Sequence, residues 1–136
     1  MTKDIWINLP VKDIKKSKEF FTQIGFSFKD RETEDMAAME VGEKKVVVML
    51  VVESKFKNFI QHNITDTESS SETVFSFDAE SRDEVDELAK KVEEAGGSVF
   101  SKPAENQGWM YGCAFTDLDG HRWNVLHMDQ SKMPKE

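Results

Sequence analysis

The sequence has little cysteine and no long hydrophobic run. Its single cysteine, Cys113, has no second cysteine in the chain to pair with, which fits a reducing compartment. The longest apolar stretch, residues 46–52, is too short to span a membrane and is typical of a strand. The N-terminus lacks the basic region and apolar run of a signal peptide. These absences predict a cytoplasmic protein without disulfides.

The sequence also lacks an excess of basic residues. Its 18 Lys and Arg against 26 Asp and Glu give a formal net charge of -8 at pH 7. Such a charge repels nucleic-acid phosphates and anionic membranes, so neither is an expected partner. Hydrophobic residues at 38% and charged residues at 32% are ordinary for a globular chain. A chain of 136 residues is long enough to fold without a metal or a disulfide.

The first half of the chain predicts a strand, a helix and three further strands. Residues 5–9 alternate between apolar and other side chains with a period of two, as a strand does. Asp13 is a good N-cap for a helix that ends at Gly25. Phe56, Phe59 and Ile60 indicate one or two later helical turns. The further strands are expected over residues 26–29, 35–41 and 45–52.

The second half repeats this order after a polar segment. Residues 66–71, Asp-Thr-Glu-Ser-Ser-Ser, are the best linker candidate. After a strand over residues 73–77, the sequence Ser-Arg-Asp-Glu from Ser81 has the form of a helix capping box. An apolar stripe from Val85 to Ala95 predicts a helix that ends at a pair of glycines. The last strands are expected over residues 98–100, 108–116 and 121–128.

The repeated order predicts an α+β fold with two βαβββ modules. A helix would cover the outer face of each sheet, and the other faces of the curled sheets would form a shared cleft. We expect a single domain over residues 1–136. Module one would span about 4–53, the linker about 54–71 and module two about 72–129.

Two motifs give the chain a family resemblance. NLPVKDIKKSKEFFTQIGF, residues 8–26, resembles the opening strand and helix of the vicinal oxygen chelate superfamily. FTDLDGHRWNVLHMD, residues 115–129, resembles its closing Asp-Pro-Asp-Gly turn and last strand, with Leu118 in place of the proline. This superfamily includes glyoxalase I, extradiol dioxygenases and bleomycin-resistance proteins. The resemblance covers nearly the whole chain, and it implies the fold more specifically than the reaction.

The resemblance also implies four metal-ligand positions, which fall on Trp6, Met49, Glu72 and Asn124. An indole nitrogen only donates hydrogen bonds, a thioether sulfur is soft, and asparagine offers only a neutral oxygen. Glu72 alone would leave a divalent ion under-coordinated. We therefore expect neither a metal at this site nor another cofactor.

Three histidines offer the alternative of a relocated metal site. His62 is expected in the linker region and His121 in a turn. His127 has the opposite strand parity to Asn124, so it should point toward the helix layer or the rim. The sequence favours solvated or structural roles for all three.

A set of aromatic, methionine and polar residues is expected to line the cleft. Trp6 either fills the volume that a metal would occupy or offers a stacking surface to a planar ligand. Methionines would give an adaptable apolar lining. Half of the aromatic residues on the strand after residue 108 should pack in the core instead. The candidate ligand-binding residues are Trp6, Asn8, Met49, Ser76, Trp109, Tyr111, Asn124 and Met128.

Glu72 is the candidate catalytic residue. In an apolar cleft its carboxylate would serve as a general base or as a partner for a cationic ligand. At the start of a strand it would instead be solvated, and the sequence leaves both interpretations open. Cys113 has no basic residue or helix N-terminus nearby in the sequence, which favours a buried, unreactive thiol.

The favoured function is metal-independent binding, or a divergent enzymatic conversion, of a small, partly planar organic molecule. One alternative is a metal-dependent lyase or dioxygenase with displaced ligands. Another is a resistance protein that sequesters a drug without reacting with it. Members of the superfamily commonly pair, and short exposed strands would benefit from pairing, so we also expect a homodimer.

Overall fold

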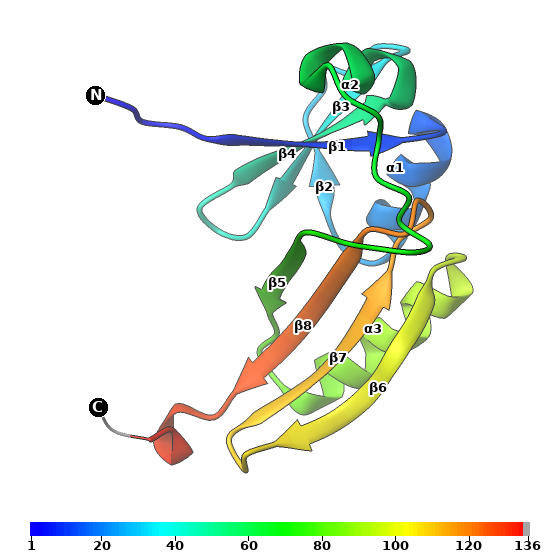
Figure 1. Ribbon diagram of the computed structural model, residues 1–136. Coiled ribbons are helices and arrows are strands. Elements are labelled where there is room, and N and C mark those ends of the chain that lie inside the picture. Colours follow the sequence, from blue (N-terminus) through cyan, green and yellow to red (C-terminus); the bar gives the residue numbers. More distant parts are fainter. Residues whose placement is uncertain (135–136) are drawn as a thin grey trace. The chain divides into compact units, whose positions relative to one another are not determined.

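The computed structural model describes residues 1–134 and divides the chain into two compact units, each with one four-stranded sheet (Figure 1). The first unit is Met1–Ser70, and the second begins at Ser71. The boundary lies in the polar segment that the sequence marks as a linker. That the two sheets share one cleft, and that the units act as one domain, stays a prediction.

The first unit contains four strands and two helices. Its sheet has the order β1-β4-β3-β2, in which β1 runs parallel to β4 and the other pairs are antiparallel. The expected helical turns form α2, which directly follows β4 and takes up part of the predicted linker. The elements are β1 (Trp6–Val11), α1 (Ile14–Gln23), β2 (Ser27–Phe28), β3 (Met36–Val41), β4 (Val46–Val52) and α2 (Glu53–Ile60).

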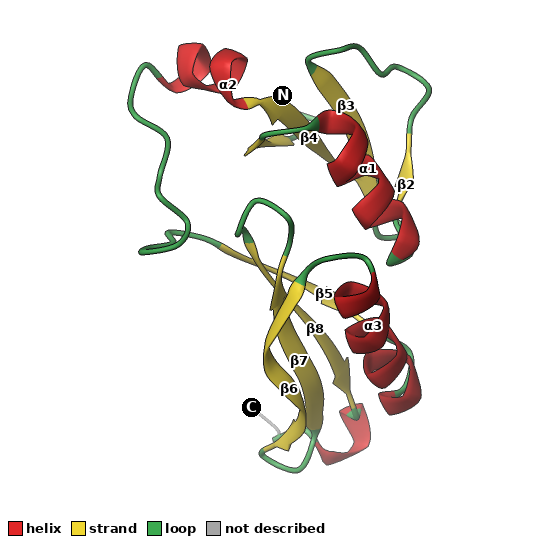
Figure 2. Ribbon diagram, turned by 90° about the vertical axis from the view of Figure 1, so that its right-hand side faces the viewer, coloured by secondary structure: helices red, strands yellow, loops and turns green. Residues whose placement is uncertain are grey.

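Helix α1 lies along one face of this sheet (Figure 2). The side chain of Asp13 accepts a hydrogen bond from the backbone N–H of Lys16 at 3.1 Å, which confirms the predicted N-cap. Gly25 follows the helix with a φ of 111°, a conformation that costs glycine little. Phe20 and Phe21 of this helix are buried, and their rings meet edge to face with centroids 5.1 Å apart.

The second unit repeats the strand and helix order of the first. Its sheet has the order β5-β8-β7-β6, in which β5 runs parallel to β8 and the other pairs are antiparallel. Both sheets are curled and neither is closed, so the predicted α+β fold with two βαβββ modules is confirmed. The elements are β5 (Val74–Asp78), α3 (Arg82–Glu94), β6 (Ser98–Asn106), β7 (Met110–Thr116), β8 (Arg122–Met128) and a 3-10 turn (Gln130–Lys132).

Helix α3 begins as the capping sequence predicts. The Ser81 side chain accepts a hydrogen bond from the backbone N–H of Glu84 at 3.1 Å. The Glu84 carboxylate reaches back to the backbone N–H of Glu80, also at 3.1 Å, one residue earlier than in the usual capping box. The helix buries Val85 and Val92. Its apolar stripe therefore forms the core of the second unit.

The last part of β6 was not predicted. The expected strand over residues 98–100 continues to Asn106. The sequence did not predict this extension, because two irregularities in the pairing of β6 with β7 interrupt the period-two pattern. Pro103 lies within this strand, which is an edge strand and tolerates the missing N–H. Within residues 1–134, no helix is long and apolar enough to cross a membrane.

Candidate functional site

Each sheet has a helix-covered face and an open face, and contacts in the second unit identify them. The Tyr111 hydroxyl donates a hydrogen bond of 2.7 Å to the Asp86 carboxylate on α3, so Tyr111 is on the helix face. Phe115 and Trp123 are paired in register and buried, and they share the parity of this face. The alternate residues of β7 and β8 therefore form the open face.

Asn124 occupies the middle of this open face. It is in register with Ser76 on one side and with Ala114 on the other. Its Oδ1 atom is buried and accepts no hydrogen bond from any described residue. A buried acceptor without a donor costs about 1–3 kcal/mol.

The first unit presents a closely similar open face. Lys18 of α1 lies 5.8 Å from the centre of the Phe28 ring, which places Phe28 and its partner Met39 on the helix face. By alternation, Asn8, Met49 and Ala38 form one row across the open face. This row matches Ser76, Asn124 and Ala114 of the second unit.

The helix caps fix the correspondence between the two units. Asn8 lies five residues before the N-cap Asp13, and Ser76 lies five residues before the N-cap Ser81. Trp6 lies seven residues before Asp13, and the same distance before Ser81 makes Val74 its counterpart. Glu72, the position that the family resemblance implies, lies two residues before Val74 and precedes β5.

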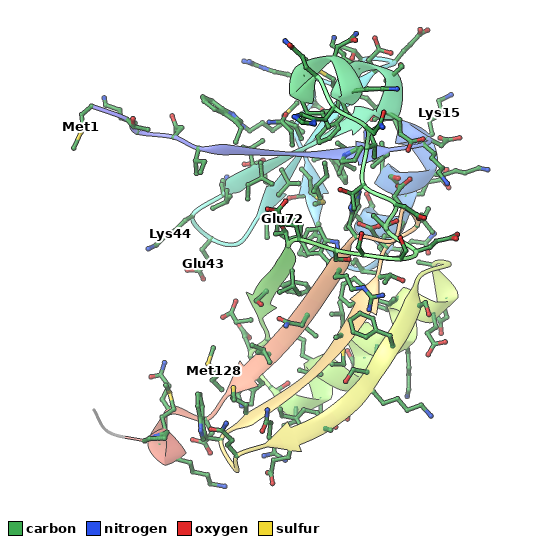
Figure 3. All side chains as sticks on the ribbon, viewed as in Figure 1. Met1, Lys15, Glu43, Lys44, Glu72 and Met128 are labelled. Carbon is green, nitrogen blue, oxygen red and sulfur yellow. The ribbon has the colours of Figure 1, made fainter. Side chains whose placement is uncertain are left out.

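The predicted site residues of the first strands differ in exposure. Trp6 is 59% exposed at the start of β1, so it does not fill a packed interior and is free to act as a stacking surface. Asn8 is exposed, whereas Met49 is partly buried. Glu72 is exposed and precedes β5, while Met128 ends β8 on its open face (Figure 3). A desolvated base at Glu72 has no support from this exposed position.

The assignment of Tyr111 to the ligand-binding face is wrong. Its ring lies 4.9 Å from the Arg82 guanidinium, and its hydroxyl is engaged by Asp86, both on α3. Trp109 has the same parity and directly precedes β7, and its buried Nε1 has no partner among the described residues. Alternation along the strand puts Trp109 and Tyr111 on the same face. Phe115 shares this face and is buried in the core, so the face is the one that α3 covers.

A buried carboxylate holds the turn that leads into β8. One oxygen of Asp117 accepts hydrogen bonds from the backbone N–H groups of Asp119 at 2.9 Å and His121 at 3.0 Å. The other accepts from Nε1 of Trp123 at 3.0 Å. Burial raises the pKa of the Asp117 carboxyl, while nearby His121 and the bond from Trp123 oppose this change. The turn thereby fixes where β8 starts.

The residues at the implied metal positions do not fit a metal ion. Trp6 and Met49 supply an indole and a thioether, Asn124 supplies a neutral amide, and the counterpart of Trp6 in the second unit is the apolar Val74. In the part of the chain that the structure describes, no three His, Cys, Asp or Glu side chains form a group suited to a metal ion.

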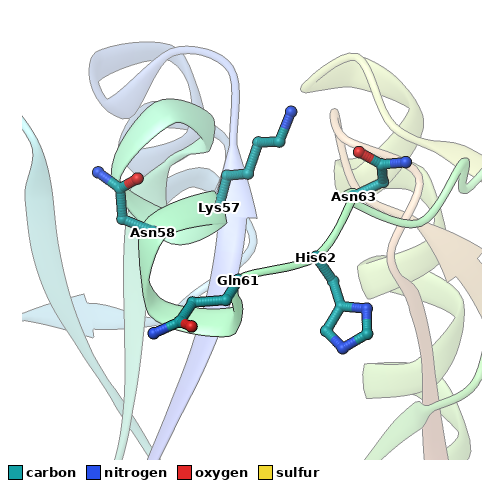
Figure 4. Close-up of a pocket in the computed structure, with 5 residues that line it drawn as sticks. All are labelled: Lys57, Asn58, Gln61, His62 and Asn63. Atoms are coloured by element: carbon teal, nitrogen blue, oxygen red, sulfur yellow. The ribbon is translucent and has the colours of Figure 1, made fainter.

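The histidines have separate surroundings. His127 lies on the helix face, where its Nδ1 is 3.1 Å from the Ala79 carbonyl oxygen, as strand parity predicts. His62 lines an open depression of about 690 Å³ after α2. The polar side chains around this depression point in different directions and do not converge (Figure 4). They are Lys57, Asn58, Gln61, His62 and Asn63.

Arg122 is an open-face residue that the sequence reasoning missed. It lies two positions before Asn124 on β8 and is in register with Val74 and Thr116. Its guanidinium carbon is 4.3 Å from the centre of the Phe100 ring on β6. The sequence could have identified Arg122, because strand parity puts residue 122 on the same face as Asn124.

Comparisons with known proteins agree on the fold. The family model described as Glyoxalase/Bleomycin resistance protein/Dioxygenase superfamily matches residues 5–125. A hypothetical protein from S. aureus is 35% identical, with a TM-score of 0.84 over 93% of this chain and 94% of that one. A family enzyme from Burkholderia phytofirmans PsJN is 17% identical, with a TM-score of 0.79 over 91% and 97% of the two chains.

A more distant solved structure is the fosfomycin resistance protein FosX from Listeria monocytogenes. It is 16% identical, with a TM-score of 0.71, and the match covers 98% of this chain and 99% of that one. This likeness concerns the fold alone. No curated protein matches the chain.

Proposed function

Because the chain belongs to the Glyoxalase/Bleomycin resistance protein/Dioxygenase superfamily, we propose that it binds a small, partly planar organic molecule without the metal ion of its metal-dependent relatives. The open face of the second sheet would supply the main polar contacts. Ser76 and Asn124 lie side by side in register there, one with a hydroxyl group and the other with an amide.

The unpartnered Oδ1 atom of Asn124 is the observation that carries this proposal. It lies at one of the four positions where the family resemblance implies a metal ligand. A neutral amide oxygen attracts a divalent ion weakly, but it accepts a hydrogen bond from an O–H or N–H group well. A ligand that donates to this oxygen would remove the cost of the buried, unpaired acceptor.

The surroundings of Asn124 favour a partly planar, partly apolar ligand. Met110 and Met128 are paired in register on the same open face, and methionine adapts to ligands of irregular shape. The open face of the first sheet offers Trp6 as an aromatic surface, with Met49 and Asn8 beside each other. We propose this face as a second binding surface, since a stacked ring gains about 0.5–1.5 kcal/mol beyond its buried area.

The test uses 4-hydroxybenzamide, a neutral planar molecule with a hydroxyl donor. The titration is followed by amide NMR signals of the ¹⁵N-labelled protein in the presence of a chelator. The signals of open-face residues such as Ser76, Ala114 and Asn124 should shift. The signals of Cys113 and Val125 on the helix face should not change. Shifts confined to the helix face, or binding that requires an added divalent ion, would overturn the proposal.

The same titration separates binding from catalysis when the probe is analysed afterwards. A chemically unchanged probe supports a binding protein that sequesters its ligand. Conversion of the probe without a metal supports a divergent enzyme. Conversion only after a divalent ion is added would favour the alternative of a metal-dependent lyase or dioxygenase.

We also propose that the chain forms a homodimer. Strand β1 is an edge of its sheet, and an apolar group lies at its start, with Ile5 71% and Trp6 59% exposed. Val46, on the neighbouring strand, is 38% exposed. Unpaired edges beside exposed apolar residues favour association. Sedimentation equilibrium should give twice the chain mass of 15.6 kDa, and a single-chain mass at micromolar concentration would refute it.

A further inference from the structure

Arg122 is a cation on the open face of the second sheet without an ionic partner in the described part of the chain. The ion pairs of this unit join Arg82 to Glu105 and Lys132 to Asp129, and no hydrogen bond or ion pair engages the side chain of Arg122 within residues 1–134. It is also partly buried. A guanidinium in such a place usually pairs with a carboxylate, because its planar fork matches the two oxygens.

The Arg122 side chain is held in position by an aromatic ring. Its guanidinium carbon lies 4.3 Å from the centre of the Phe100 ring, within the range of a cation–π contact. Phe100 is itself 48% exposed on the edge strand β6. This contact orients the guanidinium before any ligand arrives, so less side-chain freedom is lost on binding.

The second polar group on this face is Asn124, with its buried, unpartnered Oδ1. The two residues are two positions apart on β8, which separates their Cα atoms by about 7 Å in a strand. Arg122 offers donors for an anion, whereas Asn124 offers an acceptor for an O–H or N–H group. One ligand could satisfy both groups if it carried an anionic group at one end and a hydrogen-bond donor at the other.

We infer that the ligand is a small planar organic acid, with its carboxylate on Arg122 and a hydrogen-bond donor on Asn124. This inference rests on the proposed function and narrows it to a substrate class. The net charge of -8 disfavours anions at long range, so selectivity for the acid has to come from this local contact. Neutral ligands of the same shape lose the ionic contact and keep the other.

The probe is 4-hydroxybenzoate, whose carboxylate and hydroxyl lie at opposite ends of a ring and suit the separation of the two residues. Its neutral counterpart is 4-hydroxybenzamide, and benzoate lacks the donor. Dissociation constants for all three are measured by NMR titration of the full chain in chelator. We expect 4-hydroxybenzoate to bind at least tenfold more tightly than either of the other two.

Two substitutions test the role of Arg122 itself. In Arg122→Gln the advantage of the acid over the amide should vanish, because 4-hydroxybenzoate loses an ionic contact that 4-hydroxybenzamide never makes. Arg122→Lys keeps the charge without the planar fork, so its preference should be intermediate. Arg31→Gln is the matched control, because Arg31 is exposed in the β2–β3 loop and its loss changes the net charge equally. This control should retain the full preference for the acid.

The outcomes separate this inference from the function on which it rests. If 4-hydroxybenzamide binds the open face and the acid binds no better, the organic-acid assignment fails and the proposed function stands. If neither molecule binds, both fail. If the preference for the acid survives in a folded Arg122→Gln protein, the anion is recognised elsewhere and the assignment to Arg122 is overturned.

Discussion

Replacing Asp117 with asparagine is expected to destabilise the second unit by loosening the turn before β8. The asparagine oxygen retains the two acceptor contacts to the backbone N–H groups of Asp119 and His121. Its amide nitrogen then faces Nε1 of Trp123, which lies 3.0 Å from the carboxylate oxygen in the parent. Two donors would point at each other in the core, and one buried hydrogen bond would be lost.

The size of this loss follows from the two opposing contributions. A hydrogen bond to a charged acceptor contributes about 1.5–3 kcal/mol, and leaving a buried donor unpaired costs about 1–3 kcal/mol. Removal of the buried charge offsets part of this, since burial already raises the pKa of the Asp117 carboxyl. We expect a net decrease of about 1–3 kcal/mol in the free energy of unfolding at pH 7, measured by urea denaturation with an unchanged slope.

A double-mutant cycle with Trp123→Phe tests the cause. Without the indole N–H, the change Asp117→Asn no longer places two donors together, so its cost should fall to less than about 1 kcal/mol. The raised pKa also sets the sign of the pH dependence: the stability advantage of the parent over Asp117→Asn should shrink as pH rises from about 4. An equal cost of Asp117→Asn in both backgrounds would refute the role given to the Trp123 bond.

Three further predictions concern the helix face and the β7–β8 contact. Tyr111→Phe should lower the melting temperature and leave probe affinity unchanged, because it removes the hydrogen bond to Asp86 on the helix face. This bond raises the pKa of Tyr111, so the stability that the bond adds to the parent is lost above about pH 10. Burial raises the pKa of the Cys113 thiol to about 11, so Cys113 should react with a disulfide reagent at pH 8 far more slowly in the folded than in the unfolded protein, and rapid reaction would contradict its burial. Gly112→Ala would bring its Cβ to 2.5 Å from a backbone oxygen of β8 and should cost at least about 1–3 kcal/mol in a thermal melt, whereas Gly108→Asn, in open space at positive φ, should cost less.

The parts of the fold that depend on local chemistry were predictable from the sequence. Asp13 and Ser81 cap their helices because short polar side chains satisfy free backbone N–H groups there. Glycines end both helices as expected, and the alternation in the main strands gave their positions within one or two residues. The length of β6 was missed because its irregular pairing and Pro103 hide the alternation.

The candidate site was less predictable, because it depends on contacts between distant segments. Strand parity correctly separated His127 from Asn124, since it needs only the residue count. Parity does not say which face a helix covers, and Tyr111 was therefore assigned to the wrong face. The role of Arg122 depends on Phe100, which lies on a different strand and approaches it only in the folded sheet.

The central claim is that Asn124 binds a ligand directly, without a metal ion. The most direct test is a calorimetric titration of 4-hydroxybenzamide into the parent and into Asn124→Leu, each with a chelator and with an added divalent ion. The parent should bind with the same affinity under both conditions, and Asn124→Leu should bind at least tenfold more weakly under both. Binding by the parent only in the presence of the ion, or unchanged binding by Asn124→Leu, would contradict the claim.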